Sequence, residues 1–331
     1  MLFSFGKIKN IIIIGYSPII EKIFIINKKH NLNTFLITSK NQSKNIKAQI
    51  DYKIFYKLDF NFRKFIKTNF FIKETLFISL SSRWIFNKSI INFFKRKLIN
   101  FHSSRLPFFR GGATFSWQII AEDRIHNHSI HFVTEKIDQG NIIMDNISIF
   151  PSTCQIPADF ERYDINKLEK FYEEFIVKLK KKYKFNIIKQ SENFGSYFPR
   201  IFAQKDGWID WSSSSRQIYN FINSMDEPYD GAKTYLKQQV VKLKKVHIHR
   251  GGSLINSYVS GIIIKKYISW VEVACGDGYS LLVEKILNSK NQNIINKIKV
   301  GDRLVTPLKK INNAMLTRTR FGTKGFFVKN I

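Results

Sequence analysis

The sequence predicts an α/β domain with a mostly parallel sheet, followed by a small β-rich domain. Short apolar runs in the first half are continuous rather than alternating, as in strands covered on both faces of a sheet. Segments with helical spacing of apolar residues lie between these runs. From about Gly207, short β segments and turn signals replace that pattern, which indicates a small barrel.

The elements of the first domain follow from these runs. Residues 9–15 predict a buried strand that ends in a glycine turn, and residues 19–27 predict a helix. A Lys/Glu-rich amphipathic helix is expected over Leu168–Lys184. Further strands are predicted at 34–38, 76–80, 98–102 and 129–133.

The turn after the first strand bears on cofactor choice. Gly15-Tyr16-Ser17-Pro18 offers a tight turn, but it lacks the G-x-G-x-x-G glycines that admit a pyrophosphate. We therefore expect no nicotinamide cofactor.

The second half predicts one helix and five short strands. A run of serines at 212–215 can cap a helix over 216–225. The strands are expected at 232–236, 240–248, 261–265, 270–275 and 280–286. We accordingly divide the chain into a first domain over 1–190, a linker over 191–210 and a second domain over 211–331.

Composition identifies a folded globular chain of 331 residues, with 44% hydrophobic and 24% charged residues. The formal charge of +29 would ordinarily indicate an anionic partner such as nucleic acid. Lysine is abundant together with Ile, Asn and 31 Phe, however, and AT-rich codons encode all four residue types, so codon bias explains much of the excess.

Two features indicate the compartment. Cys154 and Cys275 are far apart in the sequence and form neither a disulfide framework nor a thiolate metal site, which fits a reducing environment. No apolar run approaches the roughly 18–20 residues that span a bilayer. We expect a cytoplasmic protein without a membrane anchor.

The densest polar cluster follows the strand predicted at 98–102. Asn100 and His102 are two residues apart, so on an extended segment their side chains face the same way. They leave the strand at the carboxyl edge of the sheet, where open α/β folds bind ligands. Asp138 lies in a glycine-containing loop after the next strand, and a carboxylate near an imidazole can tune it as an acid or base.

These residues carry a family resemblance. Asn100-x-His102, the Ser104–Pro107 run, Arg110-Gly111 and Asp138-x-Gly140 resemble the 10-formyltetrahydrofolate-dependent formyltransferases over roughly residues 8–185. More weakly, residues 206–211, 228–232, 276–278 and 301–303 resemble the OB-like carboxy-terminal domain of the methionyl-tRNA and sugar-acting members. Arg105 departs from the family's common leucine, and residues 112–117 replace an alanine-proline stretch. The resemblance implies a Rossmann-like formyltransferase domain followed by a small OB-like domain.

The resemblance also implies roles. An acceptor primary amine would attack the formyl carbon, with Asn100 bonding the oxyanion, His102 moving the proton and Asp138 orienting the ring. The implied contacts to the co-substrate 10-formyltetrahydrofolate are Ser79, Leu80, Ser81, Trp84, Ile85, Ile137 and Gly140. The implied acceptor-binding residues are Ser104, Arg105, Arg110 and Gly111, although Arg110 is equally suited to a structural turn.

A metal site is not expected. His126, His128 and His131 lie close together in the sequence, but three histidines on one strand do not complete a zinc set. Catalysis by Asn100, His102 and Asp138 needs neither a metal nor a covalent intermediate.

The acceptor is predicted to be a small molecule, namely an amino sugar on a nucleotide carrier. Residues 228–232 and 115–117 resemble sugar-acting members, and the segment Ser39–Asn45 is short and lacks the Gly and Arg of the basic insertion found in tRNA-acting members. The alternative is methionyl-tRNA, which the positive charge and the OB-like tail favour. An inactive RNA-binding homologue is disfavoured because all three of Asn100, His102 and Asp138 are present. The sequence does not predict the oligomeric state.

Overall fold

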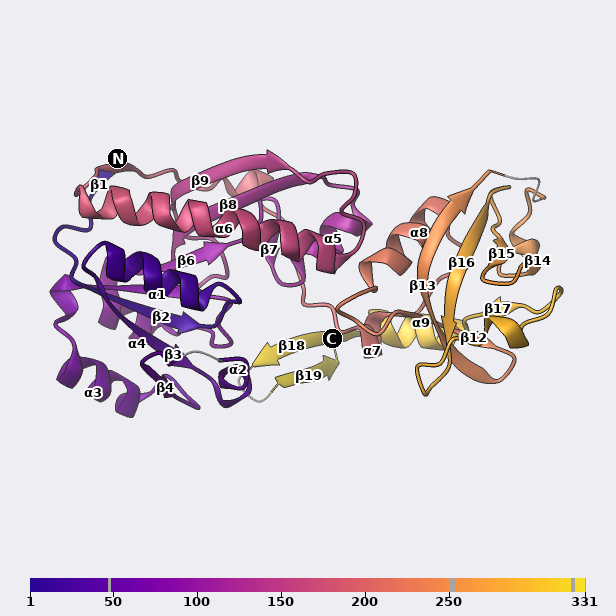
Figure 1. Ribbon diagram of the computed structural model, residues 1–331, viewed down its shortest axis with the longest axis horizontal. Helices are drawn as coiled ribbons and strands as arrows, with labels where there is room; N and C mark the ends of the chain where they lie inside the picture. Colours follow the sequence, from indigo (N-terminus) through magenta and orange to yellow (C-terminus); the bar gives the residue numbers. More distant parts are fainter. Residues whose placement is uncertain (47–48, 251–253, 323–324, 331) are drawn as a thin grey trace.

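The computed structural model describes residues 1–46, 49–250, 254–322 and 325–330. Two domains lie side by side along the long axis of the molecule (Figure 1). The first contains a seven-stranded sheet, and the second contains a six-stranded sheet.

The sheet of the first domain has the order β4-β3-β2-β5-β6-β8-β9. Strands β4 to β6 are parallel, whereas β8 and β9 run antiparallel at one edge, so the predicted mostly parallel sheet is confirmed. The strands are β2 (Asn10–Gly15), β3 (Asn33–Thr38), β4 (Tyr52–Ile54), β5 (Thr75–Leu80), β6 (Leu98–His102), β8 (Ile125–Phe132) and β9 (Ile142–Ile149).

Helices cover both faces of this sheet. The core on one face contains α1 (Ile20–Lys29) and α6 (Pro157–Lys180), and the core on the other contains α3 (Phe60–Asn69) and α4 (Lys88–Phe94). Because both faces are buried, β2 carries four consecutive isoleucines that are fully inaccessible. The shorter elements are β1 (Leu2–Phe3), α2 (Lys40–Ser43), η1 (Ile72–Glu74), η2 (Lys95–Lys97), β7 (Arg110–Gly111), α5 (Thr114–Ile120), β10 (Phe185–Asn186), η3 (Glu192–Phe194) and β11 (Tyr197–Phe198).

Helix α6 differs from the prediction of a helix over 168–184. It begins at Pro157, where the missing N–H of proline costs nothing, and Asp159 Oδ2 accepts from the backbone N–H of Ile156 at 3.3 Å. The helix ends at Lys180, and Lys182 has a φ of 53°. The early turns carry Asp164 on the buried face, which interrupts the apolar stripe on which the prediction relies.

The second domain is an antiparallel barrel with strand order β14-β15-β16-β13-β12-β17. Hydrogen bonds from Ile263 N to Asp302 O and from Leu304 N to Gly261 O, both 2.8 Å, join its two ends. The six-stranded sheet confirms the prediction that the second domain is small and β-rich. Its elements are α7 (Ala203–Asp206), α8 (Ser215–Ser224), β12 (Ala232–Leu236), β13 (Gln239–His249), η4 (Ser257–Val259), β14 (Ile263–Lys266), β15 (Val271–Ala274), β16 (Ser280–Leu287), η5 (Ile295–Lys297), β17 (Leu304–Val305) and α9 (Leu308–Met315).

The serine run caps α8 as expected. The hydroxyl of Ser214 accepts from Gln217 N at 3.3 Å, and the Gln217 side chain accepts from Ser214 N at 3.1 Å. This reciprocal pair satisfies two backbone donors at the start of the helix.

The segment between the domains belongs to both. The first core ends at Ile187 and the second begins at Ile201, so the second half of the predicted linker contributes to the second core. In the first half, β11 pairs in parallel with β7. The indole of Trp117 also donates to Pro199 O at 2.8 Å, which ties α5 to this segment.

The chain ends in a hairpin that sequence reasoning missed, formed by β18 (Thr317–Gly322) and β19 (Gly325–Asn330). In Figure 1 this hairpin (yellow) lies between the two domains, and Thr319 Oγ1 of β18 lies 3.4 Å from Asp206 Oδ2 of α7.

Two further features concern the chain as a whole. Across the described ranges, no helix has both the length and the hydrophobicity to cross a lipid bilayer. Cys154 and Cys275 are both buried free thiols.

Candidate active site

The structure brings Asn100, His102 and Asp138 together at one edge of the sheet. Asn100 and His102 lie on β6, whose other neighbours at this level are Ser79 of β5 and His131 of β8. The ring of the intervening Phe101 packs against α6, so Asn100 and His102 face the opposite side of the sheet.

The Asn100 amide is held by a histidine. Its Nδ2 lies 3.1 Å from His131 Nε2, while His131 Nδ1 is 2.9 Å from Phe132 O. A carbonyl oxygen only accepts, so His131 Nδ1 carries a hydrogen. An amide has two N–H donors, and this contact leaves the second for another acceptor.

His102 is oriented by backbone. Its Nε2 donates to Phe109 O at 2.9 Å, and its Nδ1 faces Asp138 Oδ2 at 3.8 Å. The second distance exceeds a hydrogen bond but is short enough for a strong charge interaction when the ring is protonated.

Asp138 is a nearly buried carboxylate with a left-handed φ of 54°. Its Oδ2 accepts from Gly111 N at 2.9 Å, and its Oδ1 is 3.5 Å from His131 Nε2. Burial raises the pKa of the Asp138 carboxyl, but His102, His131 and the Gly111 N–H together outweigh burial and hold that pKa well below its usual range. The site therefore contains a fixed negative charge at neutral pH.

Gly111 must be glycine to make this contact. Its φ is 105°, and a Cβ at this position would lie 2.1 Å from Phe198 O. The close pairing of β7 and β11 thus directs the Gly111 N–H at Asp138.

Arg110 and Gln190 hold the loop that contains Asp138 in place through hydrogen bonds. Arg110 is 3% exposed, and its Nε and Nη2 donate to Gln190 Oε1 at 3.1 and 2.9 Å. Gln190 Nε2 then donates to Asp138 O at 2.8 Å and Gly140 O at 2.7 Å. Of the two roles open to Arg110, these contacts correspond to the structural one.

Ser104 and Arg105 support the loop after β6. Ser104 is fully buried, and its hydroxyl donates to Phe109 O at 2.7 Å. The same oxygen also accepts the hydrogen bond from His102 Nε2. Arg105 Nη2 lies 3.4 Å from Asp123 Oδ2, and its guanidinium lies 4.5 Å from the centre of the Phe108 ring. Ser104 is thus inside the loop, and Arg105 pairs with a neighbouring segment.

The residues expected to contact the co-substrate are partly backbone and partly apolar surface. Ser79 and Leu80 are buried in β5, and the carbonyl of Ser81 accepts from Gln42 Nε2 at 3.0 Å. The indole of the buried Trp84 is 3.4 Å from Tyr56 O. Ile85 and Ile137 are 71% and 41% exposed, and Gly140 packs so tightly on Phe132 that a Cβ would lie 1.6 Å from its carbonyl oxygen.

Sequence reasoning missed His131, Gln190 and a pair of arginines. His131 lies opposite Asn100 only because of the antiparallel register of β6 and β8. Arg200 packs beside Gly112, and burial together with the Arg200 charge lowers the pKa of Arg83. Arg200 therefore lies beside the Gly111 loop, and its positive charge acts on Arg83.

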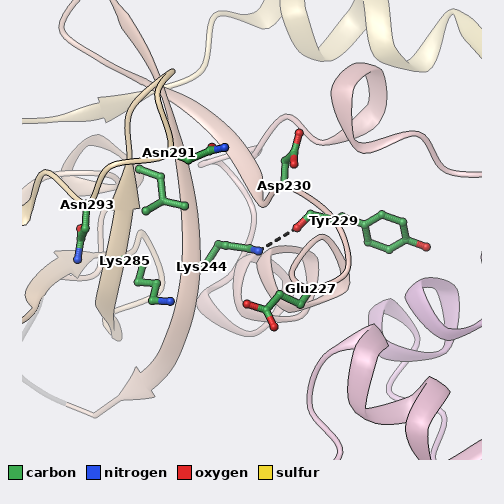
Figure 2. Close-up of a pocket in the computed structure, with 8 residues that line it drawn as sticks. Glu227, Tyr229, Asp230, Lys244, Lys285, Asn291 and Asn293 are labelled. Carbon is green, nitrogen blue, oxygen red and sulfur yellow. Dashed lines mark hydrogen bonds between the residues drawn. The ribbon is translucent and has the colours of Figure 1, made fainter.

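A separate cavity of about 360 Å³ lies in the second domain and includes none of these residues (Figure 2). Figure 2 shows Lys244 at its centre, with Nζ donating to Tyr229 O at 2.8 Å. Nζ is also 3.1 Å from Asp226 Oδ1, so this lysine is already paired. The lining carries charges of both signs, from Glu227, Asp230, Lys244 and Lys285.

Both domains match known protein families. Residues 81–155 match the family described as formyl transferase, and residues 202–298 match formyl transferase, C-terminal domain. Over 287 residues the chain is 26% identical to the bifunctional polymyxin resistance protein ArnA of Wigglesworthia glossinidia brevipalpis, covering 82% of this chain and 41% of that protein.

Two other similarities cover most of the matched protein. The methionyl-tRNA formyltransferase of Fusobacterium nucleatum is 28% identical over 231 residues, which are 66% of this chain and 71% of that protein. The crystal structure of WlaRD, a sugar 3N-formyl transferase determined in the presence of dTDP and 5-N-formyl-THF, has a TM-score of 0.62 at 19% identity and covers 84% of this chain and 98% of that one.

Proposed function

Because the chain belongs to the formyl transferase family, we propose that it transfers a formyl group from 10-formyltetrahydrofolate to the primary amine of an amino sugar on a nucleotide carrier. The observation that carries the proposal is the convergence of a neutral amide, an imidazole and a buried carboxylate at Asn100, His102 and Asp138.

The amide supplies charge stabilisation. Attack of the amine on the formyl carbon generates a tetrahedral oxyanion, and the second N–H of Asn100 donates to it. Since His131 already fixes the amide, little reorganisation is needed as the charge develops.

The imidazole moves the proton. Nε2 of His102 already donates to Phe109 O. The ring therefore takes the proton of the attacking amine at Nδ1, on the side that faces Asp138. The ionised carboxylate stabilises the imidazolium, which then returns the proton to N10 of the departing tetrahydrofolate.

The donor is assigned to the loop that follows β5 and to the loop that precedes β9. The backbone of 79–81 and the exposed apolar side chains of Ile85 and Ile137 offer polar edges and flat apolar surface to a pteridine. The WlaRD structure was determined in the presence of a formyl-folate, 5-N-formyl-THF, which supports this choice of donor.

Two observations favour a nucleotide-linked sugar as the acceptor. The segment after β3 is compact in its described part, and Gln42 of α2 ties it to Ser81, so it does not resemble a projecting basic insertion. Arg200 beside the Gly111 loop supplies a positive charge that suits the phosphates of a nucleotide carrier.

Methionyl-tRNA is the second candidate. The relative from Fusobacterium nucleatum is named for that reaction, and the formal charge of +29 suits a polyanion.

A formylation assay that offers methionyl-tRNA and a panel of amino-sugar nucleotides side by side, at several salt concentrations, decides between them. The proposal predicts turnover of an amino-sugar nucleotide with weak salt dependence. Efficient formylation of the tRNA alone, falling steeply as salt rises, would replace the sugar by tRNA.

A further inference from the structure

A second cluster of titratable side chains lies on the α6 side of the sheet and is not used by the proposed reaction. His126 and His128 are two residues apart on β8 and face α6, where Asp164 lies. The Nε2 atoms of the two histidines are 3.0 and 2.9 Å from the same carboxylate oxygen, Asp164 Oδ1. Three donor atoms of metal-ligand type thus converge on one point.

The cluster is buried, and not every polar atom in it has a hydrogen-bond partner among the described residues. His126 and His128 are each 1% exposed. Within the part of the chain that the structure describes, neither ring nitrogen of His128 has a hydrogen-bond partner, although Nε2 points at Asp164. Nε2 of His128 and Nε2 of His126 thus face one carboxylate oxygen, and a cation bound between the three atoms would satisfy His128 Nε2 while its Nδ1 stays without a partner in the described ranges.

The neighbouring groups hold these side chains in orientations suited to ligation. Nδ1 of His126 lies 3.0 Å from Ser148 Oγ, which leaves Nε2 to point inward. Ser103 Oγ donates to Asp164 Oδ2 at 3.0 Å, which leaves Oδ1 facing the two rings. Metal sites in proteins have outer hydrogen bonds of this kind to both histidine and carboxylate ligands.

Aromatic side chains close the cluster. The ring of His128 stacks on Phe171 of α6 at 5.3 Å, and the ring of His126 meets Phe150 and Tyr163 edge-on at 5.0 and 5.3 Å. This wall shields the ion from bulk solvent, while the three protein ligands leave one position of a tetrahedral site for a water molecule.

We propose that His126 Nε2, His128 Nε2 and Asp164 Oδ1 bind one divalent transition-metal ion, with Zn²⁺ the best match to two imidazoles and one carboxylate. Tetrahedral bonds of about 2.0–2.2 Å separate ligand atoms by roughly 3.4 Å, so the observed 2.9 and 3.0 Å need to widen by only about half an ångström. The ion cross-links β8 to α6, on the face of the sheet opposite to His102.

This proposal revises the expectation that the chain has no metal site. That expectation treats His126, His128 and His131 as one group, but His131 turns to Asn100, and the third ligand comes from α6. The spacing of the histidines does not reveal the third ligand, because Asp164 lies in a distant segment of the sequence.

Metal binding to the full-length chain, purified without a polyhistidine tag and stripped with a chelator, tests the proposal. We expect one Zn²⁺ per chain by elemental analysis, a dissociation constant at or below the micromolar range, and a higher melting temperature with Zn²⁺. Co²⁺ in place of Zn²⁺ is expected to give visible absorption bands of a four- or five-coordinate site.

Variants assign the site. Asp164→Asn and His128→Ala should each weaken binding at least 100-fold, and Ser148→Ala should weaken it about 10- to 100-fold. His247→Ala is the matched control, because His247 is an exposed histidine paired with Glu284 in the second domain, and it should leave binding unchanged.

A folded wild-type chain that binds less than about a tenth of an equivalent of Zn²⁺ or Co²⁺ would overturn the proposal, as would equal affinities of wild type and Asp164→Asn. If Asp164→Asn does not fold, Ser148→Ala and the Co²⁺ spectrum of the wild type decide. None of these measurements depends on formyl transfer.

Discussion

Replacing Asp138 by asparagine removes the negative charge of the candidate active site while keeping the shape of the side chain. The carboxylate lies 3.8 Å from His102 Nδ1. At an effective dielectric constant of about 20, two unit charges at that separation attract by about 4 kcal/mol. If the transition state contains the imidazolium, losing that attraction lowers the rate by about 1,000-fold, within the 100- to 10,000-fold range known for such orienting groups.

The assay is the rate of tetrahydrofolate release with a verified acceptor, measured for wild type, Asp138→Asn and Asp145→Asn. Asp145 is an exposed carboxylate on β9 of the same domain, so its variant controls for a lost charge. We expect a fall in kcat for Asp138→Asn, a nearly unchanged KM for the folate and wild-type behaviour of the control. Near-normal turnover of folded Asp138→Asn would rule out this role for Asp138, because the imidazolium would then need no counter-charge.

Further perturbations test the neighbouring contacts. Asn100→Ala should lower kcat by about 100- to 1,000-fold, because it removes an oxyanion donor; single-turnover rates check this, and a change in folate affinity alone would contradict it. Gly111→Ala should lower the free energy of unfolding by about 2–5 kcal/mol, because a Cβ would meet Phe198 O at 2.1 Å on a backbone with φ of 105°; thermal melting measures it, and an unchanged melting temperature would show that β7 and β11 pair differently. The lowered pKa of Asp138 stabilises the folded chain above the ordinary carboxyl range, and this contribution disappears as pH falls through the lowered value; acid unfolding of Asp138→Asn should therefore depend less steeply on pH than that of wild type, and parallel curves would argue against an ionised Asp138.

Much of the first domain follows from the sequence because burial on both faces requires continuous apolar runs. The isoleucines of β2 are the clearest case. The sequence pattern predicts that β8 begins at Ser129, but the strand begins at Ile125, since His126, Asn127 and His128 are polar yet buried. Polar residues buried by tertiary contacts defeat a pattern based on hydrophobicity.

In the candidate site, too, some residues could be predicted from the sequence and others could not. Asn100, His102 and Asp138 could be selected from motif spacing, and the structure places them together. His131 and Gln190 could not, because their contacts depend on strand register and on a segment that returns below the Asp138 loop. Supporting residues of this kind have no local sequence signal.

Formyl transfer at Asn100 and His102 can be observed directly. The measurement mixes the purified chain with 10-formyltetrahydrofolate and an amino-sugar nucleotide, and follows the formylated sugar by mass spectrometry beside the His102→Ala variant. We expect one formylated product per tetrahydrofolate released, formed by the wild type and lowered by about 100- to 10,000-fold in the variant. Equal product formation by folded His102→Ala would contradict the proposed function of this site.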